Sequence, residues 1–215
     1  MEPDSVGYPT TNMYPCLNTD LVFFQCFSCT SKNACATYEH LLGCPGGKIN
    51  IARHNELIDL NIQQFNTVNI ITIREPGPVS ADTKKKTDIR ATGYNLQPKH
   101  IDWAVISPNA QTYAQSASTI ALYAANDRYL YKMGKHAATH GEATNVLFVP
   151  YIMESTGAFH PTVFQELWAL SIVPGAENLP THNAPCITNA YQYWASSYSI
   201  AVVRATSRKT YQGQS

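Results

Sequence analysis

Four residues near the N-terminus have the types and spacing of a zinc site. Cys26 and Cys29 are separated by two residues, and His40 and Cys44 by three. The first pair brings two thiolates round one tight turn, and the second lies one helical turn apart, so together they provide the tetrahedral sulfur and nitrogen ligands that zinc prefers. We therefore expect a structural zinc ion here. The alternative is a set of buried thiols beside an incidental histidine.

Two aspartates, Asp88 and Asp102, fall on neighbouring predicted strands that a short turn joins. Hydrolysis of a phosphodiester requires a cation that polarises the phosphate, and Mg²⁺ or Mn²⁺ prefers carboxylate oxygens. Both carboxylates can point into one crevice, and Glu56 on the preceding predicted helix could supply a third oxygen. The alternative is that both aspartates are ordinary strand-end carboxylates. Glu56 and His54 would then be helix-front residues favoured by the dipole, and we interpret His54 in this way.

The elements that must position these residues are predicted in the order helix, three strands, helix, strand, helices. Apolar spacing and alanine content predict helices over about residues 51–65, 113–136, 161–170 and 187–205. Runs of β-branched and apolar residues predict strands over residues 67–74, 88–94, 101–107 and 146–153. This alternation indicates an α/β fold.

The length of 215 residues accommodates one main domain with a small appendage. We expect an irregular arm over residues 1–24 and the zinc knuckle over residues 25–47. The α/β domain is expected over residues 48–206, followed by a polar tail over residues 207–215.

The run from His40 through CPGG at residues 44–47 to ARHNEL at residues 52–57 resembles a known family. It is similar to the C-terminal region of site-specific non-LTR retrotransposon polyproteins. In those, a CCHC zinc knuckle leads into a restriction-like endonuclease domain of the PD-(D/E)xK class. The resemblance continues in the same order from about Cys26 to Arg204. It implies a restriction-endonuclease-like core with a three-stranded mixed sheet, in which Asp88 and Asp102 bind Mg²⁺ or Mn²⁺.

The resemblance also suggests where the catalytic lysine lies. In the simplest members of the class it follows the second acid by two residues, but Ala104 occupies that position here. The resemblance therefore implies that Lys132 on the following helix takes the role, with Lys135 in reserve. A further departure is Thr87, which stands before Asp88 where the family usually has proline.

The charge balance limits the expected partners. Lys and Arg number 15 and Asp and Glu number 15, so no net positive field draws the chain to a polyanion. Contact with DNA, or with RNA, would depend on a local basic patch. The candidates for it are Lys84 to Lys86, Lys99, Lys132, Lys135, Arg208 and Lys209, with Arg53 close by.

Three functions stay open from the sequence. The first is an active metal-dependent DNA endonuclease, and the second is a domesticated, non-cleaving relative that serves in a larger protein or ribonucleoprotein assembly. The third is a zinc-stabilised nucleic-acid-binding module without catalysis. No apolar run approaches the roughly 20 residues that span a bilayer, and residues 1–15 show no secretory leader pattern. We expect an intracellular protein, nuclear if it acts on chromosomal DNA, with an organelle left open.

Overall fold

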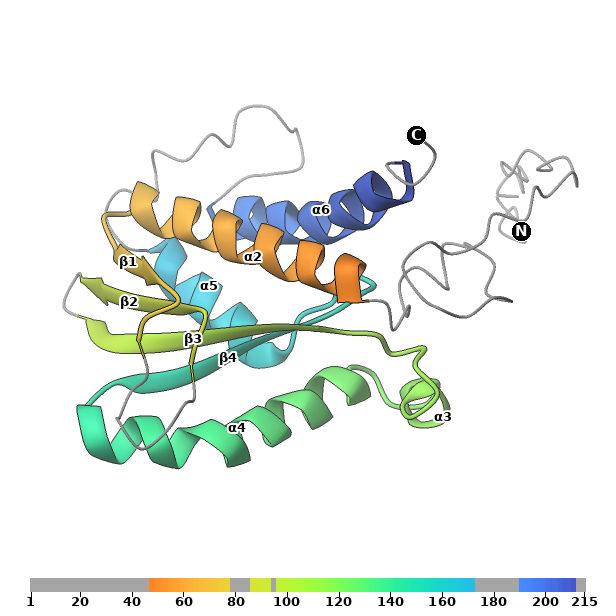
Figure 1. Cartoon of the computed structure of the whole chain (residues 1–215), viewed down its shortest axis with the longest axis horizontal. Helices are drawn as coiled ribbons and strands as arrows, with labels where there is room; N and C mark the ends of the chain where they lie inside the picture. Colours follow the sequence, from red (N-terminus) through yellow and green to blue (C-terminus); the bar gives the residue numbers. More distant parts are fainter. Residues whose placement is uncertain (1–46, 78–85, 94–95, 173–189, 212–215) are drawn as a thin grey trace, which may run out of the picture.

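A four-stranded mixed sheet lies between helices on both of its faces. In the computed structural model, the described residues are 47–77, 86–93, 96–172 and 190–211. Helices α2, α5 and α6 cover one face of the sheet, and α4 runs across the other (Figure 1). The chain is therefore a mixed α/β protein in these residues, as the sequence predicted. None of the helices in these ranges is long and apolar enough to cross a membrane.

The observed elements follow the predicted order. They are α2 (Gly47–Thr67), β1 (Ile71–Arg74), β2 (Ile89–Gly93), β3 (Leu96–Ile106), α3 (Ala114–Ala117), α4 (Tyr123–Thr144), β4 (Leu147–Glu154), α5 (Pro161–Ser171) and α6 (Ala190–Tyr211). The last helix runs past its predicted end, so residues 207–211 of the expected polar tail belong to α6. The residues expected to bind zinc, Cys26, Cys29, His40 and Cys44, lie outside the described residues.

The strands are ordered β1-β2-β3-β4 in the sheet. The first two pairings are antiparallel, and β3 pairs with β4 in parallel across a connection that contains α3 and α4. The segment predicted as a separate strand after the second helix thus joins the sheet as its fourth strand. Because β3 has 11 residues and β1 and β2 only 4 and 5, β3 continues past the start of β2. Beyond Ile101, β3 therefore pairs only with β4, and we call this the open end of the sheet.

The long helix predicted over residues 113–136 is wrong, because the chain forms two helices, α3 and α4. The hydroxyls of Ser118 and Thr119 donate to the backbone carbonyls of Gln115 and Ser116, an arrangement that competes with helix continuation. Leu122 then adopts a left-handed conformation with φ of 58°, after which α4 begins. The alanine content of the segment masked these local signals.

The strand predicted over residues 67–74 is shorter than expected. Thr67 still belongs to α2, where its hydroxyl donates to the carbonyl of Gln64. Asn69 then turns the chain with φ of 58°, a left-handed conformation that asparagine tolerates better than most residues. The sheet therefore starts only at Ile71.

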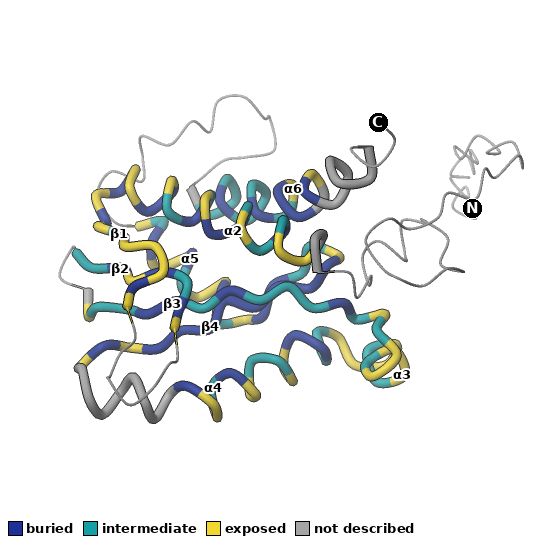
Figure 2. Tube along the Cα trace, viewed as in Figure 1, coloured by how far each residue is buried: buried dark blue, intermediate teal, exposed yellow. Residues whose placement is uncertain are grey.

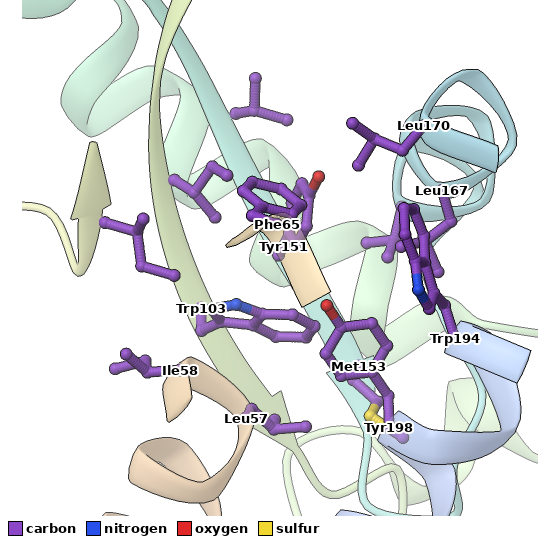
Figure 3. Close-up of a cluster of buried hydrophobic side chains, with 14 of the residues drawn as sticks. Leu57, Ile58, Phe65, Trp103, Tyr151, Met153, Leu167, Leu170, Trp194 and Tyr198 are labelled. Carbon is purple, nitrogen blue, oxygen red and sulfur yellow. The ribbon is translucent and has the colours of Figure 1, made fainter. Parts of the chain in front are cut away.

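Trp103 of β3 lies at the centre of the hydrophobic core (Figure 3). Its indole N–H donates to Asn61 of α2 at 3.1 Å, and Asn61 donates to the hydroxyl of Tyr198 on α6 at 2.9 Å. Its ring packs edge-on against Tyr151 of β4 with centroids 5.0 Å apart. All four residues are buried. Figure 2 shows the buried stretches of the strands and helices in dark blue. The network joins α2, β3, β4 and α6 around one side chain.

His160 caps the N-terminus of α5. Its Nδ1 accepts a hydrogen bond from the backbone N–H of Thr162 at 3.2 Å, and its ring stacks on Tyr129 of α4 with centroids 4.1 Å apart. Burial lowers the pKa of His160. Since Nδ1 must be unprotonated to accept this bond, the cap requires the neutral imidazole.

We predict that this cap makes folding stability depend on pH. The pKa of His160 is lower in the folded state than in the unfolded chain, so its contribution is complete above the unfolded value near 6.5 and is lost as pH falls. Between pH 7.5 and 5, the wild type should lose more unfolding free energy than His160→Asn, which keeps a neutral cap. Urea denaturation at several pH values measures both, and equal losses would contradict the assignment.

Candidate functional site

The strand register brings Asp88 and Asp102 together. Ile89 of β2 pairs with Ile101 of β3, and the backbone N–H of Asp88, just before β2, donates to the carbonyl of Ile101 at 3.0 Å, beside Asp102. One Asp88 oxygen accepts the backbone N–H of Trp103 at 2.6 Å. The two carboxyl groups interact directly with each other. Both acids therefore lie at one place, at the end of the sheet where β2 begins.

Lys132 reaches this place from α4. Its ammonium donates to Asp102 Oδ2 at 2.5 Å and to the backbone carbonyl of Trp103 at 3.2 Å. The lysine side chain is 8% exposed and that of Asp102 13%, so most of this ion pair is removed from water. Lys135, the reserve candidate, is exposed on the same helix and contacts the ring of Tyr131. Of the two lysines, the structure places Lys132 at the acids.

His54 of α2 is the fourth member of the cluster. Its Nε2 lies 3.1 Å from Asp88 Oδ1, so both oxygens of Asp88 have a partner. Sequence reasoning treated His54 as a helix-front residue and preferred Glu56. The helical period would have indicated His54 instead. His54 precedes the buried Leu57 and Ile58 by three and four residues and therefore lies on the same face of α2.

Glu56 is not brought to the acid pair. It follows His54 by two residues, which rotates it about 200° around the helix. There it lines a hollow between α2 and α6 together with Asp59 and Arg204. Lys99, a candidate for the basic patch, forms an ion pair with Glu166 of α5 and so lies on the opposite face of the sheet from α4. Neither residue reaches the cluster.

The environment shifts the pKa values of the cluster in different directions. Burial raises the pKa of the Asp102 carboxyl, and Lys132 offsets this only in part because the neighbouring Asp88 adds negative charge. Burial also acts on Asp88, but the hydrogen bond and charge of His54 and the Trp103 N–H outweigh it, so the pKa of Asp88 lies below its ordinary value. Burial lowers the pKa of Lys132 despite both acids. Lys132 and His54 thus act on two carboxylates that burial alone would favour in their neutral form.

The cluster offers oxygen atoms of the kinds that a hard divalent cation binds. The Lys132 ammonium occupies a position between a carboxylate oxygen of Asp102 and the carbonyl oxygen of Trp103, and oxygen atoms of both kinds are ligands for Mg²⁺. The described residues contain no group of three or more His, Cys, Asp or Glu side chains arranged to hold a metal. Two carboxylates suffice for Mg²⁺, which usually keeps several waters and takes further oxygens from a bound phosphate.

Neither a scan against protein-family models nor a search of curated proteins found a match for this chain. The geometry of the cluster is thus the basis for assigning a function.

We predict that Lys132 and Asp102 depend on each other for stability. Lys132→Met should lower the unfolding free energy by about 2 to 3 kcal/mol, because it leaves Asp102 buried beside Asp88 without a cation. The double variant Lys132→Met with Asp102→Asn should recover most of this loss. Urea denaturation of the two single variants and the double variant completes the cycle. Additive effects would show that the two side chains do not interact in solution.

Proposed function

We propose that this protein is a divalent-metal-dependent phosphodiester endonuclease with a restriction-endonuclease-like core. The observation that carries the proposal is the convergence of Asp88, Asp102 and Lys132 around the backbone of Trp103. Two carboxylates and a lysine are the groups that metal-assisted phosphodiester hydrolysis requires. The retrotransposon origin that we propose rests on the sequence resemblance, and the mixed four-stranded sheet with helices on both faces is compatible with it.

Each residue of the cluster has a defined part in this function. A bound Mg²⁺ or Mn²⁺ would polarise the scissile phosphate and lower the pKa of an attacking water. Asp88 and Asp102 would hold that ion, together with the carbonyl of Trp103. The Lys132 ammonium would orient the water and offset the negative charge that develops on the phosphate. His54 and the Trp103 N–H hold the two oxygens of Asp88 in place.

The substrate that we propose is DNA, with RNA as a second polynucleotide that the same chemistry would cleave. The cluster would then act on a phosphate at the open end of the sheet, where β2 starts. A nuclear location follows if the substrate is chromosomal. The non-cleaving alternative is favoured by one observation: Lys132 forms a largely buried ion pair with Asp102, as a purely structural lysine would. A cleavage assay separates the two functions.

We predict that the purified chain nicks supercoiled plasmid in Mg²⁺ or Mn²⁺ and not in EDTA. Asp88→Ala and Asp102→Ala should each lower the rate by roughly a hundredfold or more, because each removes a metal ligand. His54→Ala should lower it by about tenfold, since it removes a group that orients a ligand. Gel analysis of nicked circles measures the rates.

The matched control is Asp127→Ala, which removes an exposed aspartate on α4 whose carboxylate accepts the Tyr113 hydroxyl. This variant should nick like the wild type. Circular dichroism should show all variants folded. Activity that survives loss of either aspartate of the cluster, or a folded wild type that does not nick, would reject the nuclease and leave the non-cleaving function.

We also propose that Cys26, Cys29, His40 and Cys44 hold a structural zinc ion, on the basis of their spacing. Elemental analysis by mass spectrometry should find about one zinc per chain, and Cys26→Ser should reduce it strongly because a thiolate ligand is lost. Cys186→Ser, which changes the cysteine far from this group, is the control and should retain the metal. A wild type without zinc would contradict the proposal.

A further inference from the structure

One flank of α4 carries an exposed aromatic ring between two cations. Tyr131 is 54% exposed. The guanidinium of Arg128 lies 5.0 Å from the centre of its ring, and the ammonium of Lys135 lies 5.9 Å from it. These residues are three before and four after Tyr131, so all three lie on the same side of the helix. We call them the Tyr131 flank.

The Tyr131 flank faces away from the outer edge of β4. Tyr129 is about 200° around the helix from Tyr131. It stacks on His160. The residue before His160, Phe159, forms an antiparallel bridge with Met153 of β4. Since β3 occupies the other side of β4, Tyr129 marks the outer edge of the sheet. The Tyr131 flank therefore points in the opposite direction, toward the side of β3 and β2.

On that side, α4 leaves part of the sheet uncovered. Helix α4 packs on β4 and β3, and it lies beneath these strands in Figure 1. Arg90 of β2 pairs with His100 of β3, so its side chain lies on the same face of the sheet as α4. Helix α4 covers that face over β3 and β4. Arg90 is exposed there. It adds a cation to the same side of the molecule as the Tyr131 flank.

Gly134 leaves the helix surface open beside Tyr131. Glycine within a helix costs about 1 kcal/mol relative to alanine. A Cβ at Gly134 would meet no atom within 4 Å, so packing among the described residues does not require this glycine. It lies three residues after Tyr131, next to the ring. A flat molecule can therefore approach the ring without meeting a side chain at this position.

The flank is also close to the acidic cluster. Lys132 follows Tyr131 directly and points inward to Asp102. The charge of Arg128 acts on the Lys132 ammonium. A polynucleotide bound along the flank would thus pass beside the groups that we propose act on a phosphate.

We propose that the Tyr131 flank binds an unpaired nucleic-acid strand, with a base stacked on Tyr131 and phosphates at Arg128 and Lys135. This inference rests on the proposed nuclease function for the identity of the ligand. Stacking on an exposed aromatic ring requires a base face that is free, and a base within a duplex does not offer one. The flanking cations match the charge of the backbone. Because both cations lie over the ring, a stacked base would displace one of them, and the displaced cation would then meet the adjacent phosphate. An exposed ring with two cations on one helix thus favours a single strand over a duplex.

The experiment measures binding without cleavage. Fluorescence anisotropy with a labelled 20-nucleotide oligothymidylate, and with a duplex of the same length, is recorded for the full chain in EDTA. The wild type should bind the single strand more tightly than the duplex. Tyr131→Ala should weaken single-strand binding by about tenfold, and Tyr131→Phe should keep it because the ring remains. Arg128→Ala should lower the slope of log affinity against log salt by about one.

Two exposed residues elsewhere provide matched controls. Trp168 of α5 is 58% exposed, and Arg204 is exposed on α6, both in the helical layer opposite α4. Trp168→Ala and Arg204→Ala should bind the oligonucleotide like the wild type. Equal binding by Tyr131→Ala and wild type, tighter binding of the duplex, or equal losses in the controls would overturn the inference. Because the assay contains no divalent ion, these outcomes are independent of whether the chain nicks DNA.

Discussion

Trp103 is the residue on which both the core and the candidate site depend. Its indole ring is buried and hydrogen-bonded to Asn61, which links β3 to α2 and, through Tyr198, to α6. Its backbone N–H binds Asp88, and its carbonyl binds Lys132. The side chain of Trp103 thus packs in the core, while its backbone N–H and carbonyl bind side chains of the candidate site. Any movement of this ring within the core would shift the polar atoms that position the acids.

The cluster around Trp103 is shaped by burial and by its own charges. Two carboxylates face Lys132 and His54, and burial disfavours the ionised forms of both acids and of Lys132. A pair with only a structural role would be more stable with one acid, or with apolar residues of the same volume, because fewer charges would be buried. The nuclease function that we propose would account for the second acid, because a divalent cation takes more than one oxygen ligand. Helix α4 then has two roles, because Lys132 points inward while the Tyr131 flank faces solvent.

The order of elements and most of their positions were predictable, because hydrophobic periodicity reflects burial and burial determines the layers. The predicted long helix failed at Ser118, Thr119 and Leu122, where hydroxyl bonds to the backbone and a left-handed residue interrupt a sequence rich in alanine. The choice of Glu56 over His54 failed for a different reason. It considered only the chemical type of the side chain, whereas the apolar residues Leu57 and Ile58 already identified the buried face of α2.

The sequence by itself determined the alternation of helices and strands, the residue types available for acid chemistry, and the two neighbouring strands, β2 and β3, at which Asp88 and Asp102 lie. Only the tertiary structure decided which lysine and which residue of α2 meet these acids. The reason is that these partners come from helices on opposite faces of the sheet, far apart along the chain. Their distances depend on how each helix is rotated against the strands, and packing of the whole core around Trp103 sets that rotation.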